Sequence, residues 1–138
     1  MSFEFPFEYA YIRGIGKLFY PIIHLQLKTI SGWQEFEFLV DTGADITTVP
    51  VHFLPVLGLN KSKLSKSSTL GVGGYSIYAY DFKLDLKIGD IQFLVRACAV
   101  ETKENSMPLL LGRKDIFEEQ FNLILDSRRK VTVISKNT

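Results

Sequence analysis

The sequence predicts an all-β domain with one short helix, and three observations support this prediction. Apolar and polar residues alternate over residues 21–27, and aromatic residues occupy every second position over residues 3–11, a period of two that is typical of strands. Aromatic residues make up 13% of the chain, which favours a β-rich core. Turn signals such as Ser31-Gly32 and Ile88-Gly89-Asp90 separate the apolar runs.

The first expected strand, residues 3–11, has one wholly aromatic face. That face either belongs to the core or packs against a second subunit. Pro6 cannot donate a hydrogen bond to a sheet, so this strand is expected at an edge or an interface. The sequence around Gly14 and Gly16 ends the strand.

The other expected elements follow in order. Further strands are predicted at residues 21–27, 33–40, 76–86, 91–100, 109–111, 122–126 and 130–135. Residues 47–59 contain two prolines and allow at most short helical turns, whereas residues 61–68 are polar, rich in serine and predicted to be a loop. The one short helix is expected at residues 115–121, with Asp115 near its positive end.

Length and composition exclude several classes of protein. A chain of 138 residues fits a single domain over residues 1–138. The net charge of +1 gives no electrostatic reason to expect nucleic acid or an anionic membrane as a partner. No apolar run approaches the roughly 20 residues of a membrane span, and residues 1–4 do not look like a signal peptide. We therefore expect a cytoplasmic protein, in which Cys98 is a small core residue.

Asp41 stands out because it follows the apolar run Phe38-Leu39-Val40 directly and precedes Thr42-Gly43. A carboxylate buried without a partner costs several kcal/mol or changes its protonation, so an acid at the end of an apolar strand suggests a task. The simplest interpretation is a turn aspartate that caps its own loop. That interpretation leaves two later features unexplained, a glycine-rich stretch and a Gly-Arg pair after an apolar run.

Three motifs in this order resemble the retropepsin-like aspartic proteases, the family of the retroviral proteases and their cellular and prokaryotic relatives. The first, Asp41-Thr42-Gly43-Ala44-Asp45, is similar to the family's active-site loop. The second, Leu70-Gly71-Val72-Gly73-Gly74, is similar to the tip of its flap. The third, Leu110-Leu111-Gly112-Arg113 followed by a helical segment, is similar to the part that carries its Gly-Arg pair. Together the motifs extend the resemblance over roughly residues 20–135.

The resemblance implies a retropepsin-like half-barrel and an aspartic endopeptidase. With one such motif in the chain, it implies a homodimer in which Asp41 faces its symmetry mate as the catalytic acid. Two adjacent carboxyl groups share one proton, so the ionised one activates a water and the protonated one hydrogen-bonds the scissile carbonyl. No metal or cofactor is required.

The supporting residues also come from the resemblance. Thr42 is expected to hydrogen-bond across the dimer axis, and Gly43 and Ala44 complete the loop next to the substrate. Asp45 and Arg113 are expected to form a buried ion pair. The alternative for Arg113 is a solvated charge beside the helix.

The second motif would form a mobile flap that closes over an extended peptide or unfolded protein segment. Its glycines, Gly71, Gly73 and Gly74, could also suggest a phosphate loop, but no Gly-Lys-Ser/Thr follows them. Two departures from the family pattern limit what can be transferred: Lys114 separates the Gly-Arg pair from Asp115, and the stretch between active-site loop and flap is long.

Other features have simpler explanations. His24 and His52 lack the spacing of metal ligands along the chain, and each is expected to be a surface or strand histidine. A second function remains open: an inactive peptide-binding or dimerisation module with the same fold. The strand that joins the two subunits also remains open, since residues 3–11 and residues 131–134 are both candidates.

Overall fold

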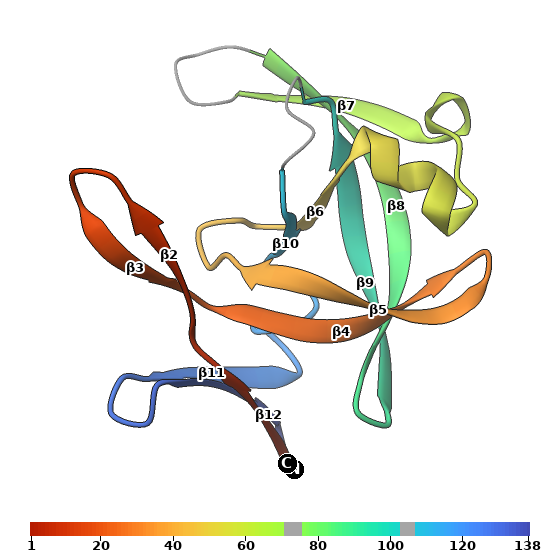
Figure 1. The fold of residues 1–138 in the computed structure, drawn as a ribbon. Helices are drawn as coiled ribbons and strands as arrows, with labels where there is room; N and C mark the ends of the chain where they lie inside the picture. The colour runs from red at the N-terminus through yellow and green to blue at the C-terminus, as the bar shows by residue number, and fades with distance from the viewer. Residues whose placement is uncertain (71–75, 103–106) are drawn as a thin grey trace.

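The computed structural model describes residues 1–70, 76–102 and 107–138, which form three β-sheets. Figure 1 shows a large curved sheet in the centre, a small sheet that holds both chain termini below it, and a separate hairpin that projects to the left. The prediction of an all-β fold is confirmed.

The large sheet has seven strands in the order β4-β5-β10-β6-β9-β8-β7. Their bounds are β4 Ile22–Thr29, β5 Gly32–Val40, β6 Thr47–Pro50, β7 Ser65–Leu70, β8 Ser76–Ile88, β9 Ile91–Val100 and β10 Leu109–Leu111. β4 also pairs with β8 at Gln26 and Leu27, so the sheet curls until its first strand meets its sixth. Most neighbours are antiparallel, but β10 runs parallel to β5 and β6 runs parallel to β9.

The core lies inside this curled sheet. It is built largely from alternate side chains of β4, β5, β8 and β9, including Ile23, Leu25, Leu27, Phe38, Leu84, Leu86, Val95 and Ala97. Because successive side chains of a strand point to opposite faces, the alternation in the sequence predicts these positions directly. The strands expected at residues 21–27 and 33–40 are confirmed with small shifts at their ends, and the strand expected at residues 91–100 is confirmed with the same bounds.

The chain termini meet in a three-stranded sheet of order β1-β12-β11, with β1 Ser2–Pro6, β11 Phe121–Asp126 and β12 Val131–Lys136. Pro6 lies on an edge strand, as expected, because β1 pairs only with β12 in this sheet. Phe3 and Phe5 pack against the core. The first half of the aromatic face is therefore part of the core.

The prediction of one continuous strand over residues 3–11 is wrong. The strand breaks at Phe7, and the second half becomes β2 Glu8–Ile12, which pairs with the unexpected β3 Gly16–Tyr20 in a sheet of its own. Phe7 stacks on Phe19 of β3, with ring centroids 4.2 Å apart. Residues 8–12 thus pair with β3 and leave the terminal sheet. The alternation of aromatic residues continues through the break and so could not predict it.

The helix predicted at residues 115–121 is also wrong, since residues 114–120 form consecutive turns. Asp115 has a φ of 66°, which interrupts helical geometry. Its carboxylate accepts a hydrogen bond from the backbone N–H of Arg96 in β9, 2.9 Å away. Asp115 therefore caps a backbone N–H of the neighbouring strand and does not lie at a helix N-terminus.

Helical turns occur instead in two 3₁₀ segments, Val51–Leu57 and Lys61–Lys63. The first agrees with the prediction that two prolines allow only short turns after β6. The predicted loop over residues 61–68 is only partly right, because β7 begins at Ser65 and pairs with the part of β8 between Ser76 and Asp81. Among the described residues, no helix has the length and apolar character that crossing a membrane requires.

Candidate active site

The backbone on either side of Asp41 is fixed by neighbouring strands. Val40 donates its N–H to the carbonyl of Pro21 at 2.9 Å, and Asp41 donates its own N–H to the carbonyl of Leu111 at 3.0 Å. Leu111 ends β10, which pairs in parallel with β5 as far as Val40. The large sheet therefore delivers Asp41 at a defined position, where β5 ends.

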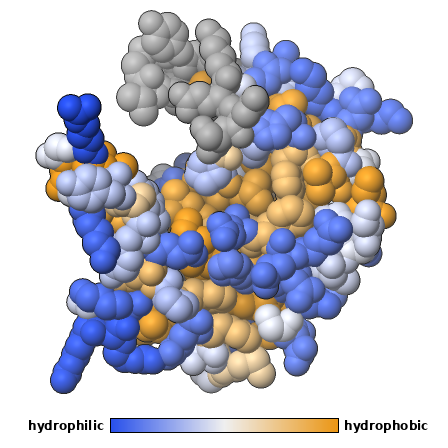
Figure 2. All heavy atoms as spheres, viewed as in Figure 1, coloured by the Kyte–Doolittle hydropathy of each residue, from blue (hydrophilic) through white to orange (hydrophobic). Residues whose placement is uncertain are grey.

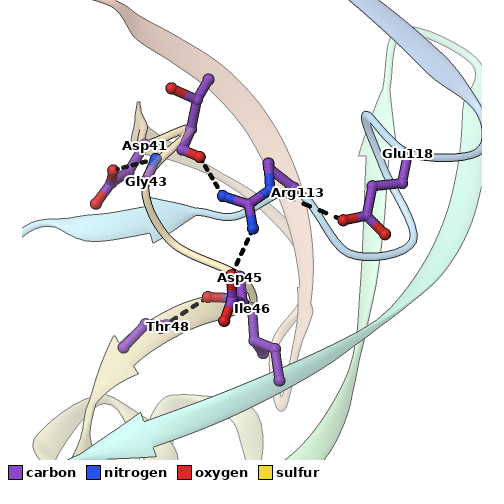
Figure 3. A network of polar contacts seen from close by, with 8 residues as sticks. Asp41, Gly43, Asp45, Ile46, Thr48, Arg113 and Glu118 are labelled. Atoms are coloured by element: carbon purple, nitrogen blue, oxygen red, sulfur yellow. Dashed lines mark hydrogen bonds and ion pairs between the residues drawn. The ribbon is translucent and has the colours of Figure 1, made fainter. Parts of the chain in front are cut away.

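The loop after Asp41 turns back on itself. Ala44 donates its N–H to the carbonyl of Asp41 at 3.1 Å, and the N–H of Gly43 donates to Oδ1 of Asp41 at 3.0 Å. This second contact orients the carboxylate, which is half-buried (Figure 3). A Cβ at Gly43 would lie 3.3 Å from that same oxygen, so a larger residue would crowd the acid.

Arg113 braces the loop from the side, as Figure 3 shows. Its guanidinium donates to the carbonyl oxygen of Thr42 and to the carboxylate of Asp45, and its Nε lies 3.8 Å from Glu118. The sequence predicts the Asp45–Arg113 contact, and the structure brings the two residues together. The expected burial is wrong, however, because the side chain of Asp45 is 86% exposed and that of Arg113 is 35% exposed.

Solvent therefore screens the attraction between the two charges, and the ion pair adds little stability. The main contribution of Arg113 is to hold the Asp41 loop in position. Its hydrogen bond to a backbone carbonyl holds the loop in one shape, which an exposed ion pair alone would do weakly. Thr42 and Asp45 are both exposed residues of the same loop.

The Gly-Arg segment runs alongside the loop at backbone distance. Arg113 and Lys114 donate their N–H groups to the carbonyls of Ala44 and Asp45, at 3.1 and 2.9 Å. A Cβ at Gly112 would lie 2.5 Å from the carbonyl carbon of Ile46, so only glycine fits without a shift of the backbone. Lys114 thus takes part in the contact between the two segments through its backbone.

Thr47 supports the site and was not singled out from the sequence. It is fully buried, and its hydroxyl oxygen accepts a hydrogen bond from the N–H of Gly112 at 3.1 Å. The sequence carries no clear signal for it, because β6 begins with two threonines and only the first of them is fully buried. Thr48 next to it donates to the carbonyl of Ile46 at 2.8 Å.

The only cysteine lies behind this loop, with its Sγ 3.5 Å from the hydroxyl of Thr48. Burial raises the pKa of the Cys98 thiol, more than the Thr48 hydrogen bond lowers it. The neutral thiol is a poor nucleophile, so Cys98 does not suit covalent catalysis.

The predicted flap falls partly outside the described residues. β7 and β8 form a hairpin whose last described pair is Leu70 with Ser76. Gly71, Val72, Gly73 and Gly74 lie in residues 71–75, outside the described ranges. The two strands that would carry a flap tip are thus in place.

Comparison with known proteins shows which family the chain matches. Residues 28–116, more than half of the chain, match the model of the gag-polyprotein putative aspartyl protease family. A retropepsin-like aspartic protease from Rickettsia conorii superposes with a TM-score of 0.64 at 21% identity, covering 97% of this chain and 91% of its own. EIAV protease, in a complex with the inhibitor HBY-793, gives a TM-score of 0.55 at 20% identity, covering 72% of this chain and 86% of its own. At these identities the two structures show a shared fold.

Proposed function

Because this chain belongs to the gag-polyprotein putative aspartyl protease family, we propose that it is an aspartic endopeptidase whose active site is shared by two copies of the chain. One observation carries the proposal: Asp41 stands at the end of β5, its carboxylate held by the N–H of Gly43 and its loop braced by Arg113. A turn aspartate that only capped its loop would not need that brace.

The reaction follows from two carboxyl groups that share one proton. One Asp41 per chain cannot act as base and acid at once, so the second carboxyl group comes from a second copy. The ionised carboxylate takes a proton from a water whose oxygen attacks the scissile carbonyl carbon. The protonated carboxyl group donates its proton to the carbonyl oxygen, which gives a tetrahedral intermediate.

The remaining loop residues position the two acids. Thr42, which is exposed in the single chain, would contact the second copy. Gly43 and Ala44 keep the backbone close to the substrate, and Asp45 and Arg113 hold the loop. The flap, Leu70-Gly71-Val72-Gly73-Gly74, would cover an extended peptide that binds mainly through its backbone.

The β2–β3 hairpin supports the presence of a second copy. Its exposed large hydrophobic side chains are Tyr9, Tyr11, Ile12, Ile15 and Phe19, and orange atoms lie among blue ones on the hairpin at the left of Figure 2. An isolated two-stranded hairpin is marginally stable in water, so packing of another surface on these side chains would stabilise it. Pro21 lies at the base of the hairpin, and its carbonyl accepts a hydrogen bond from the N–H of Val40, the residue before Asp41. A second copy whose Asp41 lay next to this Asp41 would therefore also lie near the hairpin.

Cleavage of an unfolded protein tests the proposal. The wild type is expected to release fragments at acidic to neutral pH, and Asp41→Asn to release none above background. Asp90→Asn is the matched control, because Asp90 lies exposed in the turn between β8 and β9. If the wild type and Asp41→Asn cut equally, the catalytic assignment is wrong. If neither cuts but both retain a labelled peptide, the chain is a peptide-binding module.

A further inference from the structure

Three potential metal ligands, none of them a residue of the Asp41 loop, come together in the folded chain. Glu8 of β2, His24 of β4 and Glu37 of β5 each offer one ligand atom, and these atoms all lie within 4.8 Å of one another. The same three side chains line a cavity of about 320 Å³, together with Phe5, Pro6 and Ile22.

The fold assembles this group from three strands. His24 and Glu37 are directly opposite each other in the antiparallel β4–β5 pair, so their side chains leave the same face of the sheet. Glu8 is the first residue of β2, directly after the break at Phe7, and its carboxylate lies beside His24 and Glu37. Spacing along the sequence could not reveal the group, because each residue comes from a different strand.

The imidazole of His24 has different neighbours on its two nitrogens. Nε2 lies 3.7 Å from a carboxylate oxygen of Glu8, and Nδ1 lies 3.6 Å from a carboxylate oxygen of Glu35. Metal-bound histidines commonly have this arrangement, with one nitrogen on the metal and the other N–H directed at a carboxylate. The ring of Phe5 lies nearly parallel to that of His24, with centroids 6.4 Å apart.

We propose that Glu8, His24 and Glu37 bind a zinc ion and that Glu35 orients His24 for this purpose. Two ligands about 2.1 Å from a tetrahedral zinc are roughly 3.4 Å apart, so the 3.7 Å between His24 and Glu8 needs little adjustment. A histidine in the set favours zinc over calcium and magnesium, which prefer oxygen ligands alone. A dication also balances the charge of the surrounding carboxylates.

Such an ion would fasten the β2–β3 hairpin to the main sheet. Glu8 lies at the base of the hairpin, whereas His24 and Glu37 lie on β4 and β5. Glu37 precedes Asp41 by four positions on the strand that delivers it. Zinc would therefore set the hairpin's position relative to the active-site loop, independently of whether the chain cleaves peptides.

Zinc titration of the metal-free protein tests the proposal by calorimetry and by thermal unfolding. One zinc per chain is expected to bind with a rise in Tm. His24→Gln and Glu37→Gln each remove a proposed ligand and should weaken zinc binding at least tenfold, since loss of an orienting partner alone already costs about 10–100-fold. His52→Gln is the control, because His52 is the other histidine of the chain and lies exposed in the 3₁₀ segment Val51–Leu57.

Cobalt(II) provides a second measurement, since a tetrahedral site gives visible absorption that His24→Gln should remove. Asp41→Asn should bind zinc as the wild type does. The proposal is wrong if the wild type shows no saturable zinc binding, if both His24→Gln and Glu37→Gln bind as tightly as the wild type, or if Asp41→Asn alone removes the binding. The last result would place the ion at the catalytic acids.

Discussion

The hydrogen bond between Thr47 and Gly112 joins the start of β6, just after the Asp41 loop, to the Gly-Arg segment that runs alongside that loop. The N–H of Gly112 is buried and donates to the Thr47 hydroxyl at 3.1 Å. This contact holds the Gly-Arg segment against the start of β6, so Arg113 can reach Thr42 and Asp45. A single buried hydroxyl thus supports residues that do not touch it.

Thr47→Val keeps the shape of the side chain and removes the acceptor. The Gly112 N–H is then buried without a partner, and the free energy of unfolding should fall by about 1–3 kcal/mol. Urea unfolding measures this change. Thr132→Val is the matched control, because the buried hydroxyl of Thr132 has no hydrogen-bond partner among the described residues. The control should be neutral or stabilising; equal losses in both variants would contradict the assigned role of Thr47.

The Cys98 thiol provides a pH test of the packing behind the loop. Burial raises its pKa above the ordinary value of 9.0, so the folded chain retains a proton that the unfolded chain loses. This contribution to stability is complete below pH 9 and decreases as the pH rises above that value. The wild type should therefore lose more stability than Cys98→Ala between neutral and strongly alkaline pH. Equal losses would show that the thiol is not buried as described.

The strands of the main sheet could be predicted from the sequence because each has one buried face. In β4, the alternation of Ile23, Leu25 and Leu27 with polar neighbours gives both the strand and its core side. In β9, the expected bounds and the observed ones coincide. The physical signal is the regular alternation of core-facing apolar residues with solvent-facing polar ones, and it is strong when a strand borders the core.

The secondary-structure predictions are wrong where a residue distant in the sequence determines the local structure. The break at Phe7 depends on β3, and the turn at Asp115 depends on the backbone of Arg96. The strand β7 reads as a polar loop because its stability comes from pairing with β8. In the site, Asp41 and Arg113 follow from motifs, whereas Thr47 and the group around His24 require the folded chain.

The β2–β3 hairpin makes a prediction about association. Tyr11 is 80% exposed and Ile15 is 68% exposed, and both lie far from the core. Tyr11→Ser combined with Ile15→Ser should weaken dimerisation at least tenfold, because apolar area buried at an interface drives association. Sedimentation velocity over a range of concentrations measures the effect.

Ile30→Ser is the control for this experiment. Ile30 is 72% exposed, but it lies in the turn between β4 and β5 and not on the hairpin. Its loss should leave dimerisation unchanged. A double variant that dimerises as the wild type does would exclude the hairpin from the interface, while the shared active site could still form through other surfaces.

On the proposed mechanism, the molecule as a whole would supply one half of a symmetric active site. Its sheets deliver one acid, one braced loop and the two strands that would carry one flap. Both termini lie together in the terminal sheet, where β1 and β12 are already paired within the chain. Exchange of these two strands between copies would have to break that pairing, so the β2–β3 hairpin is the better candidate for contact with a partner.

Mixing the wild type with an excess of Asp41→Asn tests the shared site most directly. After subunit exchange with a tenfold excess, only about a tenth of wild-type chains remain paired with each other, and mixed dimers have a single Asp41. Peptidase activity per wild-type chain should therefore fall to about a tenth. The same excess added without time for exchange should have no effect. Activity that stays proportional to the wild-type chains at every ratio would contradict a site built from two copies of Asp41.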